Sequence, residues 1–336
     1  MKTSSYCTAA STMLMGIKRV AKQGITHPFG DSRSVKQAFP AGINTEDADP
    51  FLMCDYFDMK ESKGKASHDD EFPVDWHPHR GFDIATYLRT GTGRHADSLG
   101  NRETFSTPGM QWMSVGSGVE HAEGGANEKG EFVQGFQIWT NVPGDRKMDD
   151  PRYGTVPTKD MPLVDVGDKE GSKARILAGN AFGVAGPFET VQPVQMIDFE
   201  LKPNTKLNFD VADGLDTAMA YVYQGSLDSV NGGTAGHEGP VGAGHVILFD
   251  ADSGEKRGLE LVASSSKNDE AAGENIGANI LLFAGKKLKE PIAWHGPIVM
   301  NTQEQIRQTL HELRTGQFPP KRVDWDYKRM SSFPKA

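Results

Sequence analysis

Two short runs in the first half of the chain carry side chains that could hold a metal ion. In each of them, His77-Pro78-His79 and His121-Ala122-Glu123, one residue separates two potential ligands. On a β-strand this spacing directs both side chains to the same face. Two neighbouring strands carrying such pairs would direct three imidazoles and one carboxylate towards a common point. The spacing therefore predicts a four-ligand site. Its members would be His77, His79, His121 and Glu123.

Three nitrogen ligands and one oxygen ligand leave one or two positions of a first-row metal open for a substrate or dioxygen. Such a donor set is more typical of iron oxygenases than of closed structural zinc sites. A chain with ten histidines can also contain one His-x-His run by chance. The second pair, about forty residues downstream, favours the metal site, because a jelly roll returns to the same barrel wall at roughly this distance.

Strand and turn signals dominate the rest of the chain. The 38 glycines and 19 prolines separate short segments rich in Val, Ile, Phe and Tyr, such as residues 83–88, 136–139 and 194–199. This spacing is typical of a sandwich or barrel of antiparallel strands. The elements that position the two ligand pairs are therefore expected to be strands of an all-β domain.

One helix is predicted near the C-terminal end. Thr302 is a good N-cap, and Gln305 three residues later completes a capping box. Ile306, Leu310 and Leu313 then share one helical face, and a glycine at position 316 ends the run. The narrow apolar stripe favours a helix that packs across a barrel or the domain seam over a helix that binds a partner.

Six segments surround the ligand pairs in a fixed order. They are Asp49-Pro50-Phe51-Leu52, His77-Pro78-His79-Arg80-Gly81-Phe82, Pro108-Gly109-Met110-Gln111-Trp112-Met113, Gly116-Ser117-Gly118-Val119-Glu120-His121-Ala122-Glu123, Glu290-Pro291-Ile292 and Gly296-Pro297-Ile298-Val299-Met300-Asn301-Thr302. In this combination the chain resembles the pirin family of the cupin superfamily. The resemblance implies two tandem cupin domains, each a jelly-roll β-barrel. It also implies a metal, usually iron, held by the residues that match His77, His79, His121 and Glu123.

Two positions depart from the pattern of these families. Cupins commonly carry a glutamate shortly after the first histidine pair, and Asp83 stands there instead. In pirins this carboxylate is not the main ligand, so the resemblance implies that the site survives the change. The usual Pro-Gly-Asp turn reads Pro108-Gly109-Met110, which removes a side chain suited to capping its own turn.

Three segments are expected along the 336 residues, a length that suits two domains. Residues 1–30 would form a flexible N-terminal extension, residues 31–160 a metal-binding barrel, and residues 161–336 a second barrel with the C-terminal helix. The second half repeats the strand-and-turn pattern without a His-x-His pair. His237 and His245 are eight residues apart and are interpreted as surface or structural histidines.

Composition limits the classes of protein and of partner. The hydrophobic fraction is 37%, and no apolar run approaches the roughly eighteen residues that a membrane span needs. A net charge of −9, with both signs mixed along the chain, does not favour direct binding to nucleic acid. Two cysteines, Cys7 and Cys54, form no disulfide framework, which fits a reducing compartment. Composition thus indicates a cytoplasmic protein, and the resemblance to pirins implies the nucleus as an alternative location.

The first thirty residues leave two interpretations open. They contain lysine, arginine, serine and threonine, but no acidic residue before Asp31, as in an organelle transit peptide. The alternative is a disordered tail followed by the first strand of the domain.

The resemblance implies one of two functions. Some pirins are quercetin 2,3-dioxygenases, which open the central ring of a flavonol with dioxygen and release carbon monoxide. Others are nuclear proteins in which iron acts as a redox-sensitive element for binding a transcription factor. A metal-binding protein without turnover is a third possibility. As an enzyme, the chain would use Glu123 as metal ligand and as the base that deprotonates a substrate hydroxyl.

Substrate residues and metal identity are less closely defined by the sequence. Four apolar residues near the ligand pairs could form the walls around a flat aromatic substrate, with core packing as the alternative. They are Phe82, Trp112, Met113 and Phe136. We expect Fe(2+), but three histidines and a carboxylate also accept Mn, Co, Ni or Cu, so availability in the cell decides.

Overall fold

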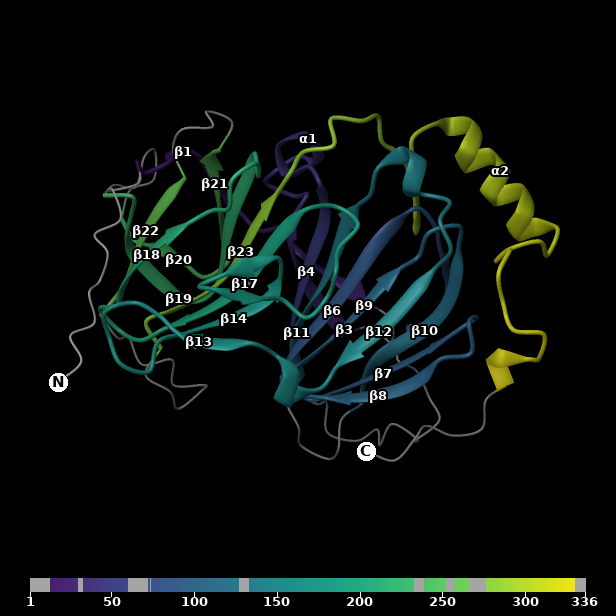
Figure 1. Ribbon diagram of the computed structural model, residues 1–336, viewed down its shortest axis with the longest axis horizontal. Coiled ribbons are helices and arrows are strands. Elements are labelled where there is room, and N and C mark those ends of the chain that lie inside the picture. The colour runs from purple at the N-terminus through teal and green to yellow at the C-terminus, as the bar shows by residue number, and fades with distance from the viewer. Residues whose placement is uncertain are drawn as a thin grey trace.

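Two strand-rich domains lie side by side in the computed structural model (Figure 1). In Figure 1 the first domain is mainly blue and teal, and the second is mainly green. The structure describes residues 13–29, 33–59, 72, 74–126, 133–232, 239–251, 257–265 and 276–329.

The N-terminal domain is built from two antiparallel sheets. The larger, seven-stranded sheet has the order β12 (Arg152–Val156), β9 (Gly109–Ser114), β6 (Phe82–Thr90), β11 (Val133–Asn141), β4 (Phe51–Met59), β3 (Arg33–Phe39) and β2 (Thr26–Phe29). The smaller, four-stranded sheet has the order β5 (Val74–His79), β10 (Val119–Ala126), β7 (Thr92–Asp97) and β8 (Arg102–Ser106). Side chains from the two sheets meet in the interior between them, because Glu123 of β10 reaches Gln111 of β9.

The strands of the C-terminal domain form one ten-stranded sheet, whose main path is similar to the larger sheet of the first domain. This main path has the order β1 (Gly16–Lys22), β21 (His245–Asp250), β19 (Thr217–Val230), β23 (Ala278–Gly285), β17 (Val194–Leu201), β14 (Lys173–Ala178) and β13 (Leu163–Asp165). The long strand β19 also pairs with β20 (Val241–Gly242) and β22 (Gly258–Ala263), and β22 pairs with β18 (Lys206–Asp210). Two short hairpins complete the strands, β15 (Asn180–Ala181) with β16 (Val184–Ala185) and β24 (Ala293–His295) with β25 (Ile298–Met300).

The two large sheets pack against each other at the domain seam. One buried apolar cluster contains Tyr56 and Phe136 from the first domain and Tyr221 and Phe283 from the second. Each large sheet therefore buries both of its faces, one in its own domain and one at the seam. As a result, strands β9 and β11 are buried along their whole length, and the usual alternation of apolar and polar residues is lost.

The helical elements among the described residues are few and short. They are α1 (Thr45–Ala48), α2 (Gln303–Arg314) and the 3₁₀ turns η1 (Gly144–Arg146), η2 (Thr158–Asp160) and η3 (Tyr327–Arg329). The predicted capping box is confirmed, because Thr302 and Gln305 exchange hydrogen bonds at the start of α2. Within the described residues, no helix has both the length and the apolar character needed to cross a membrane.

The chain returns to the N-terminal domain at its C-terminal end. After β23 it forms β24 and β25, and Ile298 makes an isolated bridge to Arg80. Helix α2 then lies against the first domain, where Glu312 pairs with Arg80 at 2.6 Å. In Figure 1 the yellow helix α2 accordingly lies beside the blue domain and far from the green one.

The prediction of an all-β chain with a short C-terminal helix is confirmed. The sheets are not closed into barrels: the N-terminal domain has two separate sheets, and the C-terminal domain has one open ten-stranded sheet. The boundaries at residues 30 and 160 stay predictions. Strand β1 lies inside the stretch 1–30 and pairs with β21 of the C-terminal domain, whereas residues 1–12 lie outside the described residues.

Candidate metal centre

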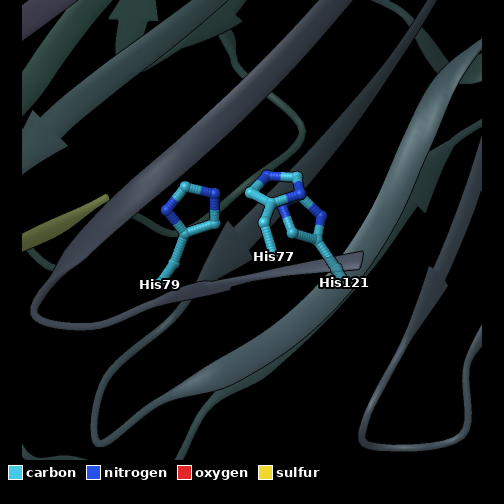
Figure 2. Close-up of side chains that lie close together, drawn as sticks. All are labelled: His77, His79 and His121. Carbon is cyan, nitrogen blue, oxygen red and sulfur yellow. The ribbon is translucent and has the colours of Figure 1, made fainter. Parts of the chain in front are cut away.

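Three histidines meet inside the N-terminal domain. Strands β5 and β10 pair antiparallel, with His121 opposite His77 and Val119 opposite His79. His77 and His79 are two residues apart on β5, so their rings lie on the same face of the sheet. Figure 2 shows these two rings grouped with the ring of His121. One ring nitrogen from each histidine can be chosen so that all three lie within 4.8 Å of one another. The structure thus brings together the three imidazoles predicted as ligands.

Backbone carbonyls orient two of the rings. His77 Nδ1 lies 2.7 Å from the carbonyl oxygen of Asp75, and His79 Nδ1 lies 3.1 Å from that of Pro297. A carbonyl oxygen only accepts hydrogen bonds, so Nδ1 of each ring carries the proton and Nε2 keeps a free lone pair. Metal-binding histidines generally donate their second ring N–H in this way. The orientation therefore suits metal binding through Nε2.

The third ring is buried without a hydrogen-bond partner. Both ring nitrogens of His121 lack one, and its side chain is fully buried. Burial, followed by the proximity of His77 and His79, holds the pKa of His121 well below its usual range. Burial and then His77 lower the pKa of His79 in the same way. Both rings are therefore neutral near pH 7, the form that binds a metal, and a cation at the common point would satisfy His121.

The C-terminal segment fixes the end of the strand that carries two of the ligands. Gly81 has a φ of +91°, and a Cβ atom there would lie 2.1 Å from the carbonyl oxygen of Val299. Only glycine tolerates both conditions. The fully buried Arg80 joins the same turn to α2 through Glu312. Segments more than two hundred residues apart in the chain thus hold His79 in place.

Glu123 is buried beside the histidines but bonds to other groups. One carboxylate oxygen accepts a hydrogen bond from the amide of Gln137, and the other accepts one of 3.1 Å from the amide of Gln111. The group of ligand atoms within 4.8 Å of one another contains the three imidazoles and not this carboxylate. The pairing of β5 and β10 shifts register between His121 and Glu123. Metal binding by Glu123 stays a prediction.

The four apolar candidates for substrate binding separate into two places. Phe82 packs against His79, with 5.5 Å between ring centroids, and Met113 belongs to the same apolar cluster as Phe82. Trp112 and Phe136 instead belong to the cluster at the domain seam. Two of the four therefore line the metal-binding interior, and two face the other domain. A role in substrate binding remains a prediction for Phe82 and Met113.

Other residues near the histidines had not been singled out. The Trp139 ring lies 5.3 Å from that of His79, and its indole N–H has no partner. The His95 ring lies 5.4 Å from that of His121 and stacks on Tyr153 at 4.1 Å. Trp139 stands two residues after Gln137 on one strand, so the two side chains share a face. His95 and Asp97 have the same one-residue spacing as the ligand pairs, and His95 Nε2 lies 3.0 Å from a carboxylate oxygen of Asp97.

Asp83 and the C-terminal histidines lie outside this group. Asp83 accepts a hydrogen bond of 3.1 Å from Trp112 Nε1, and burial raises the pKa of Asp83 to about 6. His245, half-buried, has its Nδ1 atom 2.9 Å from the carbonyl oxygen of Gly242. His237 lies outside the described residues. In the part of the chain that the structure describes, His77, His79 and His121 form the one cluster with metal-ligand spacing.

Comparison with known families matches both domains. The family signature described as Pirin matches residues 32–140, and the signature described as Pirin C-terminal cupin domain matches residues 196–319. The prediction of two cupin-type domains is therefore confirmed.

Similar proteins of known name agree with this match. A Thermoplasma acidophilum protein with the provisional name quercetin 2,3-dioxygenase is 33% identical over 278 residues, which are 77% of this chain and 97% of that protein. A pirin-like protein of Caulobacter vibrioides is 32% identical over 90% of this chain and all of its own length. The crystal structure of quercetin 2,3-dioxygenase from Acinetobacter baumannii has a TM-score of 0.78 at 27% identity, covering 91% of this chain and 99% of that one. This chain therefore belongs to the pirin family.

Proposed function

We propose that this protein is a metal-dependent dioxygenase that opens flavonols such as quercetin. The observation that carries the proposal is the group of three converging imidazoles, two of them held neutral by burial, beside a buried carboxylate. Such a donor set leaves room for a substrate on a first-row metal. The likeness to proteins named quercetin 2,3-dioxygenase supports this choice of substrate class.

His77, His79 and His121 would hold the metal, with Glu123 as the proposed fourth ligand. We propose iron, and manganese, cobalt, nickel or copper would fit the same donors. When bound, the metal supplies a Lewis acid for the substrate hydroxyl and the redox chemistry that activates dioxygen. The reaction joins both atoms of dioxygen to the flavonol and releases one ring carbon as carbon monoxide.

The protein's own groups would prepare the substrate. Glu123 accepts the proton of the flavonol hydroxyl, which makes the substrate more electron-rich and a better target for dioxygen. Phe82 and Trp139, whose rings lie 4.5 Å apart, provide apolar surface beside His79 for a flat aromatic ring. The sheets on either side exclude water, because His121 and Glu123 are both buried.

The alternative function is an iron-binding, redox-sensitive co-regulator that binds a transcription factor in the nucleus. It uses the same histidines and stays a prediction. A dependence of transcription-factor binding on the oxidation state of the iron, together with no turnover of any flavonol, would favour it.

Exposure of the iron-loaded protein to quercetin in air tests the proposal. We expect loss of the flavonol absorption band, with one carbon monoxide released for each dioxygen consumed. The matched control is His121→Ala, which should show neither change. A protein with a full iron site that leaves quercetin unchanged would contradict the proposed activity.

A further inference from the structure

A row of polar side chains crosses the interior face of the seven-stranded sheet. Its members lie directly opposite one another on successive strands. They are Thr155, Gln111, Thr86, Gln137, Asp55 and Gln37. We call this set the polar row. On one side of it lies the apolar cluster that contains Phe82 and Trp139, and on the other a cluster that contains Phe57 and Leu88.

The middle of the polar row holds the carboxylate of Glu123 across the interior. Gln137 donates to Oε1, and Gln111 donates to Oε2 at 3.1 Å. Gln111 also donates to the hydroxyl of Thr86, which itself lies 3.5 Å from Oε2. All four side chains are at most 9% exposed, so water does not replace these bonds easily.

The amides of Gln111 and Gln137 would compete for the Glu123 carboxylate with a metal held by the three imidazoles. In this arrangement Glu123 does not share the 4.8 Å group with His77, His79 and His121. To join them, the carboxylate would have to move, and a move away from Gln111 and Gln137 would weaken the hydrogen bonds that it accepts from them. A hydrogen bond to a charged, buried group is stronger than one between neutral groups, so the two amides contribute to the free energy of this move.

We infer that Gln111 and Gln137 are positioning residues that hold the Glu123 carboxylate in a place off the common point of the imidazoles and thereby limit how strongly it binds the metal. The inference rests on the proposed role of Glu123 as a ligand. A carboxylate with this second resting place can leave the metal without becoming an unpaired buried charge. Such a departure would free a carboxylate oxygen to accept the proton of a substrate hydroxyl.

The test measures metal affinity and is independent of turnover. Co²⁺ is titrated against a competing chelator into full-length, metal-free protein carrying Gln137→Met or Gln111→Met, which keep the length of the side chain and remove the donor. We expect each variant to bind Co²⁺ about tenfold more tightly than wild type. The substitution removes a hydrogen bond that stabilises the Glu123 carboxylate in the metal-free protein, whereas the metal-bound protein does not depend on that bond. In a Glu123→Gln background the same substitutions should leave the affinity unchanged.

The matched control is Gln134→Met on the same strand. Gln134 is also buried, but its amide donates to Tyr56 at the domain seam, so its loss should not alter Co²⁺ affinity. If Gln137→Met does not fold, Gln137→Asn withdraws the amide by one methylene and serves instead. Weaker or unchanged Co²⁺ binding, or the same change in the Glu123→Gln background, would overturn the inference. Failure of the dioxygenase proposal would appear separately, as unchanged quercetin beside intact affinities.

Discussion

The interiors of the two domains differ although their main sheets share the same plan. In the C-terminal domain, a row at the middle of the sheet runs through residues opposite one another on successive strands. They are Val20, Ile247, Ala220, Leu282, Ile197 and Ile176. All of them belong to, or pack against, one continuous apolar core. In the N-terminal domain, the polar row stands between two smaller apolar clusters.

The difference shows that one fold can enclose an apolar interior in one domain and a polar interior with a candidate metal centre in the other. An apolar interior gains free energy from burial and excludes any group that must bind an ion. The N-terminal domain instead buries imidazoles, amides and a carboxylate, each of which needs a partner. Its partners come from the polar row and from the C-terminal segment, as with Pro297 and His79. We therefore expect substitutions in the two interiors to affect different properties.

The largest expected effect concerns the ligands. His77→Ala, His79→Ala or His121→Ala should reduce bound metal to well below one ion per chain and abolish turnover, with the domain still folded. The apolar clusters hold the fold, so metal is not required for folding as it is in a zinc finger. Elemental analysis and circular dichroism measure the two properties. Near-stoichiometric metal in all three variants would be incompatible with the assignment.

The next effect concerns the carboxylate. Glu123→Gln, once its site is filled with excess metal, should turn over a flavonol about 10²–10⁴-fold more slowly, because glutamine cannot accept the substrate proton. The deficit should shrink at higher pH, where solvent removes that proton. Steady-state rates across a pH series on fully metallated protein measure this. A wild-type rate near neutral pH would leave Glu123 as a ligand at most.

A polar residue in the C-terminal row should act on stability alone. Leu282→Gln buries an amide among apolar side chains and should lower the free energy of unfolding by about 2–5 kcal/mol. Leu282→Met, which conserves volume, should cost less than about 1.5 kcal/mol. Urea unfolding measures both, and metal content should not change in either. If Leu282→Gln lowered the free energy of unfolding no more than Leu282→Met does, this interior would tolerate polar groups and the contrast would fail.

A smaller effect comes from a buried charge in the N-terminal domain. Lys147 is fully buried, and its ammonium donates to the carbonyl oxygen of Gly81 at 2.7 Å. Burial lowers the pKa of Lys147 from 10.5 to about 8. Between these values the unfolded chain binds more protons than the folded one, so stability should rise with pH, by at most about 3 kcal/mol. Unfolding of wild type and Lys147→Met between pH 8 and 10 measures the difference, and a rise of equal size in both would contradict it.

The last variant, in the C-terminal domain, is expected to have no effect on metal binding. His245→Ala should leave metal content and turnover unchanged, because His245 lies at the edge of an apolar domain and outside the histidine group. A loss of metal in this variant would reveal a site in the C-terminal domain and remove the contrast between the two interiors.

The sequence predicts the histidine group because two-residue spacing on a strand is a local property. It does not predict the positions of Gln111 and Gln137, since their shared row depends on the register of three strands. The sequence also does not show that Phe82 lies in the interior of its domain and Phe136 at the domain seam. Both faces of the large sheet are buried, so the alternation of apolar and polar residues that usually marks the two faces is absent. Contacts such as that between His79 and Pro297 join segments 218 residues apart, which local patterns cannot reveal.

The amount of metal bound by the protein purified from its own host tests the central claim most directly. If only the interior of the N-terminal domain holds a metal, the wild-type protein should contain one first-row metal ion per chain, and we propose iron as that metal. That ion should remain in His245→Ala and disappear in His121→Ala. Two ions per chain, or one ion that survives His121→Ala, would contradict the account.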